Sequence, residues 1–146
     1  MGSNQENLSF VSFALGEDDY AINVGEVYGI YHGLPVIPNP DGPAFLEGDV
    51  QFRDVRVPIV NLRRFAGMSD SRQTGRWILM VNNSGGPVGL VVDRVMEVVK
   101  LKPDSLQPAP DGINGPVSDY ITAIADHHGR SMFVPDFNRL IHDVIS

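Results

Sequence analysis

Short runs of apolar residues, separated by turn-forming residues, repeat along almost the whole chain. The clearest runs lie at residues 8–15, 77–81, 88–93 and 95–101, and glycine, proline, asparagine or aspartate bounds them. Runs of this length are typical of β-strands joined by tight turns. Roughly ten of them follow one another at a spacing of about 8–12 residues, which predicts an all-β barrel or sandwich.

Breaks in this pattern predict how the strands are grouped. Four prolines fall within residues 34–43, and such a dense break favours two small barrels over a single ten-stranded barrel. The next residues, 43–47, are expected to form one helical turn that begins at Pro43 and ends at Gly48. The Pro/Gly-rich stretch 107–119 is predicted to be a mobile, solvent-facing loop.

One segment near the end of the chain has helical rather than strand periodicity. Asp136 is a suitable N-cap for it. The residues expected on its apolar face are Phe137, Leu140, Ile141 and Ile145. The sequence therefore predicts an all-β fold of two small barrels with a short C-terminal helix.

Composition sets the size of the folded unit and excludes some kinds of site. The chain has 146 residues, of which 42% are hydrophobic and 20% charged, as in an ordinary globular domain. Residues 1–7 are polar and are predicted to be a flexible N-terminal tail, followed by one folded unit at 8–145. No cysteine is present, so disulfides and thiolate chemistry are excluded. No apolar run approaches the roughly 18 residues that a membrane helix needs.

Charge is unevenly distributed along the sequence. The net charge of −7 argues against nucleic acid as a partner. One window of 24 residues nevertheless carries six arginines against two aspartates, so it is +4 and the remainder is −11. These arginines are either an ordinary solvated face or a basic patch for an acidic partner or an anionic ligand. The six are Arg53, Arg56, Arg63, Arg64, Arg72 and Arg76.

Catalytic and metal-binding patterns are missing from the sequence. It contains no glycine-rich phosphate loop and no Gly-x-Ser-x-Gly element. The four histidines lack the spacing of a metal site, so we predict no metal, no cofactor and no enzymatic activity. The hairpin expected at 48–62 instead places Arg53 and Arg56 around a tight turn beside apolar positions. This arrangement favours a module that binds another protein.

Seven short motifs occur in a fixed order from residue 8 to residue 145. None is specific alone, but their order resembles that of the CheW family, the adaptor proteins of bacterial chemosensory arrays. The motifs are Leu15–Tyr20, Val27–Ile30, Pro43–Gly48, the Gln51–Asp54 turn with Pro58–Arg63, Val88–Asp93, Lys102–Pro110 and the segment 121–140.

The resemblance implies two interlocked five-stranded SH3-like barrels with a hydrophobic groove between them. The groove would take the cytoplasmic tip of a methyl-accepting chemoreceptor, and strand surfaces of the second barrel would bind the regulatory domain of a CheA-like histidine kinase. The protein would then be cytoplasmic, held near the inner membrane by receptor arrays without entering it. By position, the receptor-binding residues would be Val27, Gly48, Arg53, Val88, Gly89, Val95 and Val98.

Several positions depart from the family pattern and mark the chain as a divergent adaptor. Gly29 stands where the family has an acidic residue, Glu47 where it has lysine, and Asn61 where it has aspartate. The Asn-Leu-Arg-Gly turn is here Gln-Phe-Arg-Asp, which puts the Asp54 carboxylate next to Arg53.

A second hypothesis follows from the basic window. The same fold could serve as a sensor that binds an anionic small ligand, such as a cyclic dinucleotide. The arginines proposed for that ligand are Arg56, Arg63, Arg64, Arg72 and Arg76.

Overall fold

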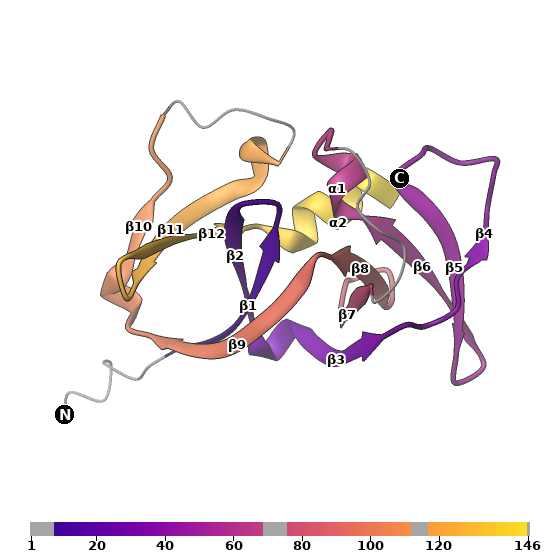
Figure 1. The fold of residues 1–146 in the computed structure, drawn as a ribbon, viewed down its shortest axis with the longest axis horizontal. Helices are drawn as coiled ribbons and strands as arrows, with labels where there is room; N and C mark the ends of the chain where they lie inside the picture. Colours follow the sequence, from indigo (N-terminus) through magenta and orange to yellow (C-terminus); the bar gives the residue numbers. More distant parts are fainter. Residues whose placement is uncertain (1–7, 69–75, 112–116, 146) are drawn as a thin grey trace.

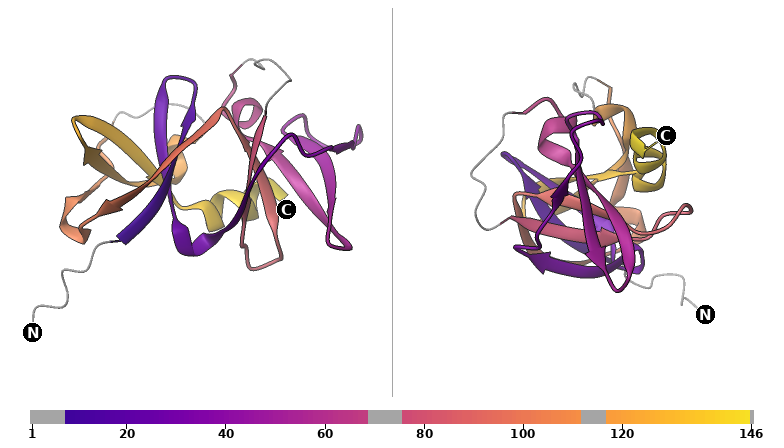
Figure 2. Two further views of the ribbon diagram at one scale, coloured as in Figure 1. Left: turned by 60° about the horizontal axis from the view of Figure 1, so that its bottom comes forward. Right: turned by 90° about the vertical axis from the view of Figure 1, so that its right-hand side faces the viewer.

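Two β-sheets form the protein in the computed structural model, which describes residues 8–68, 76–111 and 117–145 (Figures 1 and 2). The predicted tail at 1–7 lies outside these residues. We call the two sheets subdomain A and subdomain B. Subdomain A has the strand order β10-β11-β12-β2-β1-β9, and subdomain B has the order β3-β7-β8-β6-β5-β4. The predicted all-β fold with two subdomains is confirmed.

Each sheet contains five longer strands and one very short strand, which accounts for twelve strands in the described residues where ten were expected. The short ones are β4 (Ile37–Pro38) and β10 (Leu106–Pro108). The others are β1 (Leu8–Leu15), β2 (Asp18–Asn23), β3 (Val27–His32), β5 (Leu46–Phe52), β6 (Val55–Asn61), β7 (Trp77–Val81), β8 (Val88–Val92), β9 (Arg94–Leu101), β11 (Ile121–His127) and β12 (Arg130–Pro135).

The helical elements are short, and the longest of them lies between the subdomains (Figure 1). They are the 3-10 turns η2 (Val24–Glu26), η3 (Pro103–Ser105) and η4 (Ser118–Tyr120) and the helices α1 (Leu62–Phe65) and α2 (Phe137–Ile145). The Asp136 side chain accepts a hydrogen bond from the Arg139 N–H at 3.1 Å, which confirms the expected N-cap of α2. No helix in the described ranges is long and apolar enough to cross a membrane.

Three groups of buried side chains hold the fold together. One cluster around Val99 fills subdomain A, and another around Ile59 fills subdomain B. The third and largest contains residues of both sheets together with the buried face of α2. The two subdomains therefore share a core, and because burial of apolar area is the main favourable contribution to folding, we expect them to fold as one unit.

The segment at 34–43 does not separate the two subdomains. It lies within subdomain B, where it leads from β3 through β4 to β5. The chain passes from A to B at η2 and returns at Asp93, between β8 and β9. Proline marks the segment as irregular backbone, but it carries no information about which strands pair. Subdomain B is thus one continuous stretch, inserted between the first two strands and the last four strands of subdomain A.

Asp93 lies where the chain crosses back from subdomain B to subdomain A, and there it joins three of the sequence motifs. Its Oδ2 accepts a hydrogen bond from the Gly16 N–H at 2.6 Å and forms an ion pair with Arg63 Nη1, also at 2.6 Å. Its own N–H donates to the Ala14 carbonyl at 3.1 Å. One carboxylate therefore ties the β1–β2 turn and α1 to the crossing, so three of the motifs are joined in the folded chain.

Two local expectations were wrong, and a third, the loop at 107–119, lies partly outside the described residues. Residues 43–45 form a turn, not a helical turn, with the Leu46 N–H donating to the Pro43 carbonyl at 3.0 Å, and Gly48 lies inside β5. In α2 the fourth buried residue is Val144, while Ile145 is 38% exposed, because helical spacing from Phe137 reaches position 144 after two turns. The range 107–119 contains the end of β10 and the first two residues of η4, and its residues 112–116 lie outside the described residues.

Candidate functional site

Arg53 lies at the exposed tip of the β5–β6 hairpin. Phe52 pairs with Val55, so Arg53 and Asp54 form a two-residue turn. Both have positive φ, 51° and 65°, the geometry that a type I′ hairpin turn requires. The Arg53 guanidinium lies over the Phe52 ring, 5.2 Å from its centroid. Among the described residues no ion pair joins Arg53 to Asp54, so the side chain is presented to solvent.

Apolar side chains are exposed on two strands that each lie at the edge of a sheet. On β3, Tyr28 and Ile30 are 39% and 41% exposed; on β9, Met96 and Val98 are 36% and 60% exposed. Figure 1 shows β3 and β9 on the same, lower side of the molecule. Apolar side chains left exposed on unpaired edge strands are candidates for contact with another protein. We call the exposed faces of β3 and β9 the edge surface.

The seven predicted receptor-binding residues do not form one exposed patch. Gly48, Val88 and Gly89 are buried, Val27 and Val95 are half-buried against the shared core, and only Arg53 and Val98 are exposed. Val27 of β3 and Val88 of β8 are nevertheless neighbours of one residue, because both pair with Val81 of β7, the strand that lies between β3 and β8.

The predicted basic patch is also divided. Arg63 is paired with Asp93, Arg76 forms an ion pair with Glu47, and Arg64 donates to the Ala44 carbonyl at 3.0 Å. Arg56 lines a different cleft of about 390 Å³, together with Val88 and the end of α2. Arg72 lies outside the described residues. Arg64 and Arg76 line a cleft of about 450 Å³ together with Glu47, so the described arginines are divided between two clefts and the ion pair with Asp93.

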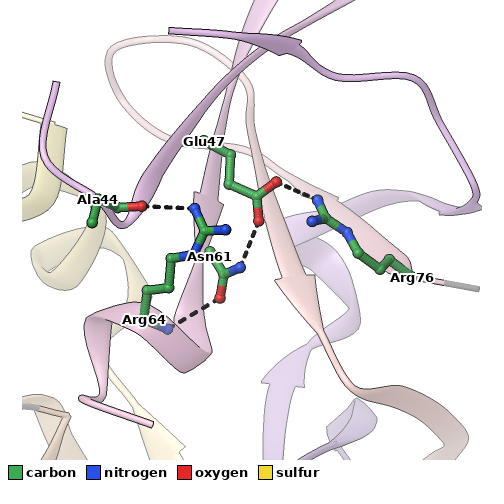
Figure 3. Close-up of polar contacts among 5 residues, drawn as sticks. All are labelled: Ala44, Glu47, Asn61, Arg64 and Arg76. Carbon is green, nitrogen blue, oxygen red and sulfur yellow. Dashed lines mark hydrogen bonds and ion pairs between the residues drawn. The ribbon is translucent and has the colours of Figure 1, made fainter. Parts of the chain in front are cut away.

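A part-buried polar network joins β5, the end of β6, α1 and the residue before β7 (Figure 3). The Asn61 side-chain amide donates to Glu47 Oε2 at 2.5 Å, and its Oδ1 accepts from the Arg64 N–H at 3.1 Å. The other Glu47 oxygen pairs with Arg76. Glu47 and Asn61 are two of the departures from the family pattern, and they touch. An amide can donate to a carboxylate whereas a second carboxylate cannot, so the two departures fit each other.

Sequence reasoning missed Tyr28, Ile30 and Met96. Each lies on a strand whose apolar residues were predicted, but the pattern of a strand does not tell whether it lies at an edge of its sheet. Within the described residues, no group of three or more His, Asp or Glu side chains is arranged to hold a metal ion.

Two barrels with a shared core and an exposed edge surface define an SH3-like domain suited to contact with other proteins. The chain belongs to the CheW-like domain family, which matches residues 9–144. It is 29% identical to chemotaxis protein CheW of Treponema pallidum over 96% of this chain and 85% of that protein. It is also 29% identical to chemotaxis protein CheW of Klebsiella aerogenes, over 90% of this chain and 80% of that protein.

A solved structure has the same fold. The scaffolding protein TtCheW from Thermoanaerobacter tengcongensis superposes with a TM-score of 0.82 over 89% of each chain, at 23% sequence identity. These comparisons give no support to the alternative of an anionic small ligand.

The Arg53–Asp54 turn carries strain that can be removed. Replacing Asp54 with glycine is expected to stabilise the protein by about 1 kcal/mol, because glycine adopts positive φ without the clash of a Cβ atom. Urea denaturation of the variant and the wild type measures the difference. A loss of stability would mean that the Asp54 side chain makes a contact that outweighs the strain.

Proposed function

We propose that this chain is a non-enzymatic adaptor that couples a chemoreceptor to a CheA-type histidine kinase in the bacterial cytoplasm. The observation that carries the proposal is the family match over residues 9–144. Relatives at 29% identity are named as chemotaxis proteins, and the structural neighbour as a scaffolding protein. A scaffold needs surfaces and no reactive groups, in agreement with the edge surface described above.

Receptor docking would use the edge surface together with Arg53. The β3 face supplies Tyr28 and Ile30, which can cover an apolar helix tip, and Arg53 supplies an exposed cation for an acidic side chain of the receptor. Buried apolar anchors beside a charge-assisted pair are the usual source of affinity at such contacts. The kinase would bind strand surfaces of the second barrel that lie outside the edge surface, so both partners could be held at once.

A pair of variants in the same turn tests receptor docking. Arg53→Asn removes the cation but keeps the positive φ, which asparagine tolerates, and Asp54→Gly relaxes the turn but keeps the cation. We expect Arg53→Asn to weaken binding of a receptor hairpin tip about tenfold or more, and Asp54→Gly to bind like the wild type. Calorimetric titration with a tip fragment from the same organism measures both.

The kinase regulatory domain serves as the second titrant in that experiment. All three proteins are expected to bind it equally, which also shows that the variants are folded. Equal receptor binding by Arg53→Asn would contradict the role of Arg53. Failure of the wild type to bind the kinase domain at tens of micromolar would contradict the adaptor function itself.

A further inference from the structure

The edge strand β9 contains one residue more than the stretch of β1 that it pairs with. Ser12 of β1 pairs with Glu97 of β9. The next residue of β1, Phe13, pairs with Val95, so the register shifts by one and Met96 is the residue in excess. Such a β-bulge bends the strand and changes the direction of its side chains. Met96 is 36% exposed and belongs to the edge surface.

The bulge places Val95 and Val98 on the same face of the sheet. Side chains alternate between the two faces of a regular strand, so residues three positions apart would point to opposite faces. Here Val95 pairs with Phe13 and Val98 pairs with Val11, and both partners belong to the shared core. Paired residues of antiparallel strands lie on one face. Val95 accordingly packs against the core, and Val98 continues the same face outward, where it is 60% exposed.

The edge strand β3 has the same arrangement in subdomain B. Its register against β7 shifts by one after Val27, so Tyr28 is the residue in excess. Val27 and Ile30, which are three positions apart, pair with two residues of the shared core, Val81 and Leu79. Val27 packs against the core and Ile30 is 41% exposed. Each edge strand therefore needs its bulge to direct one apolar side chain inward and the next one toward a partner.

A buried hydroxyl group holds the bulge of β9 in place. Ser12 Oγ accepts a hydrogen bond from the Glu97 N–H at 3.2 Å and donates one to the Glu97 carbonyl at 3.1 Å. Ser12 is 2% exposed, and a buried hydroxyl is costly unless it is hydrogen-bonded. Without it, a regular ladder would compete with the bulge. A slip of one residue moves the slipped part to the opposite face, so Val95 or Val98 would leave the core face.

We propose that Ser12 is a positioning residue for receptor docking, which holds the bulge at Met96 and thereby keeps Val98 directed toward the receptor tip. Ser12 is buried and acts through the side chains of β9 instead of touching the receptor. This inference rests on the proposed receptor docking and adds a residue beneath the edge surface that controls it.

The test compares Ser12→Ala, which removes the hydroxyl, with Ser12→Thr, which keeps it. Ser105→Ala is the matched control, because it removes another hydrogen bond from a serine to the main chain, the 2.7 Å bond to the Lys102 carbonyl in the turn after β9. Each protein is titrated with a receptor hairpin tip and with the kinase regulatory domain, both from the same organism. We expect Ser12→Ala to weaken tip binding about fivefold or more. Ser12→Thr and Ser105→Ala should bind the tip like the wild type, and all four proteins should bind the kinase domain equally.

Hydrogen exchange reports on the bulge without a receptor. In the wild type the Glu97 amide is expected to be protected, because its N–H donates to Ser12 Oγ. In Ser12→Ala its exchange should speed up about tenfold or more, while the amides of β7 keep their rates. The wild-type measurement holds even if Ser12→Ala does not fold, which thermal melts establish.

Fast exchange of the Glu97 amide in the folded wild type would overturn this inference and leave receptor docking intact. Unchanged tip binding by folded Ser12→Ala, or an equal loss in Ser12→Ala and Ser12→Thr, would do the same. If the wild type failed to bind the tip while still binding the kinase domain, receptor docking would fail and this inference with it.

Discussion

Replacing Asn61 with aspartate is expected to cost about 2–4 kcal/mol of folding stability at pH 7, since it would place two buried carboxylates against each other without a proton between them. The Asn61 amide nitrogen lies 2.5 Å from Glu47 Oε2, and the Asn61 residue is only 5% exposed. Arg76 can neutralise one of the two charges but not both. Denaturant unfolding of the variant and the wild type measures the loss.

The double variant Asn61→Asp/Glu47→Gln is the matched control. It restores one amide, one carboxylate and a similar shape, with the charge moved from position 47 to position 61. We expect its stability to lie within about 1 kcal/mol of the wild type, because buried polar groups are costly chiefly when unpaired. The loss in Asn61→Asp should also shrink as the pH falls, since a carboxyl next to a like charge keeps its proton to higher pH. If the free-energy losses of the two single substitutions simply added up in the double variant, this account would be contradicted.

Replacing Gly48 with alanine is expected to cost about 3 kcal/mol or more, because both the backbone and the space at this position require glycine. Its φ is +148°, and a Cβ atom would lie 1.9 Å from the Ile37 carbonyl oxygen. That oxygen belongs to β4, which pairs with β5 through Ile37 and Pro38. A main-chain atom cannot turn away as a flexible side chain could, so the substitution should separate β4 from β5. Thermal unfolding measures the effect.

Gly67→Ala isolates the backbone contribution. Gly67 also has positive φ, +77°, but no atom lies within 4 Å of where its Cβ would be. This control should therefore lose only about 1–2 kcal/mol from backbone strain. Equal losses in the two variants would contradict the collision with Ile37. Since Gly48 is buried, any loss of receptor binding in Gly48→Ala should accompany lost stability, unlike the loss expected for Arg53→Asn.

The strands and the number of subdomains could be predicted from the sequence, whereas the connection between the subdomains could not. The run at 77–81 predicts a buried strand through its unbroken apolar residues, and β7 is buried from Ile78 to Val81. The crossings at η2 and Asp93 depend on which strands pair, and pairing is decided by contacts between distant residues. The proline-rich segment therefore suggested two barrels correctly but did not mark where they join.

The candidate site was predictable only in part, for a similar reason. The residues next to Arg53 in the sequence predict that it lies in a turn, and the structure has that turn between β5 and β6. The partners of Arg63 and Arg76 come from residues about 30 positions away in the sequence. Their pairing could not be seen in a local pattern. Departures from a family motif became interpretable once their three-dimensional neighbours were known.

Reconstitution of kinase control tests the adaptor function most directly. Membranes containing a chemoreceptor are combined with a CheA-type kinase, both from the same organism, and autophosphorylation is measured with and without this chain. The account predicts that the receptor changes kinase activity only when the chain is present, and that Arg53→Asn abolishes this coupling while Asp54→Gly preserves it. Receptor control of the kinase without the chain, or no control with it, would contradict the account.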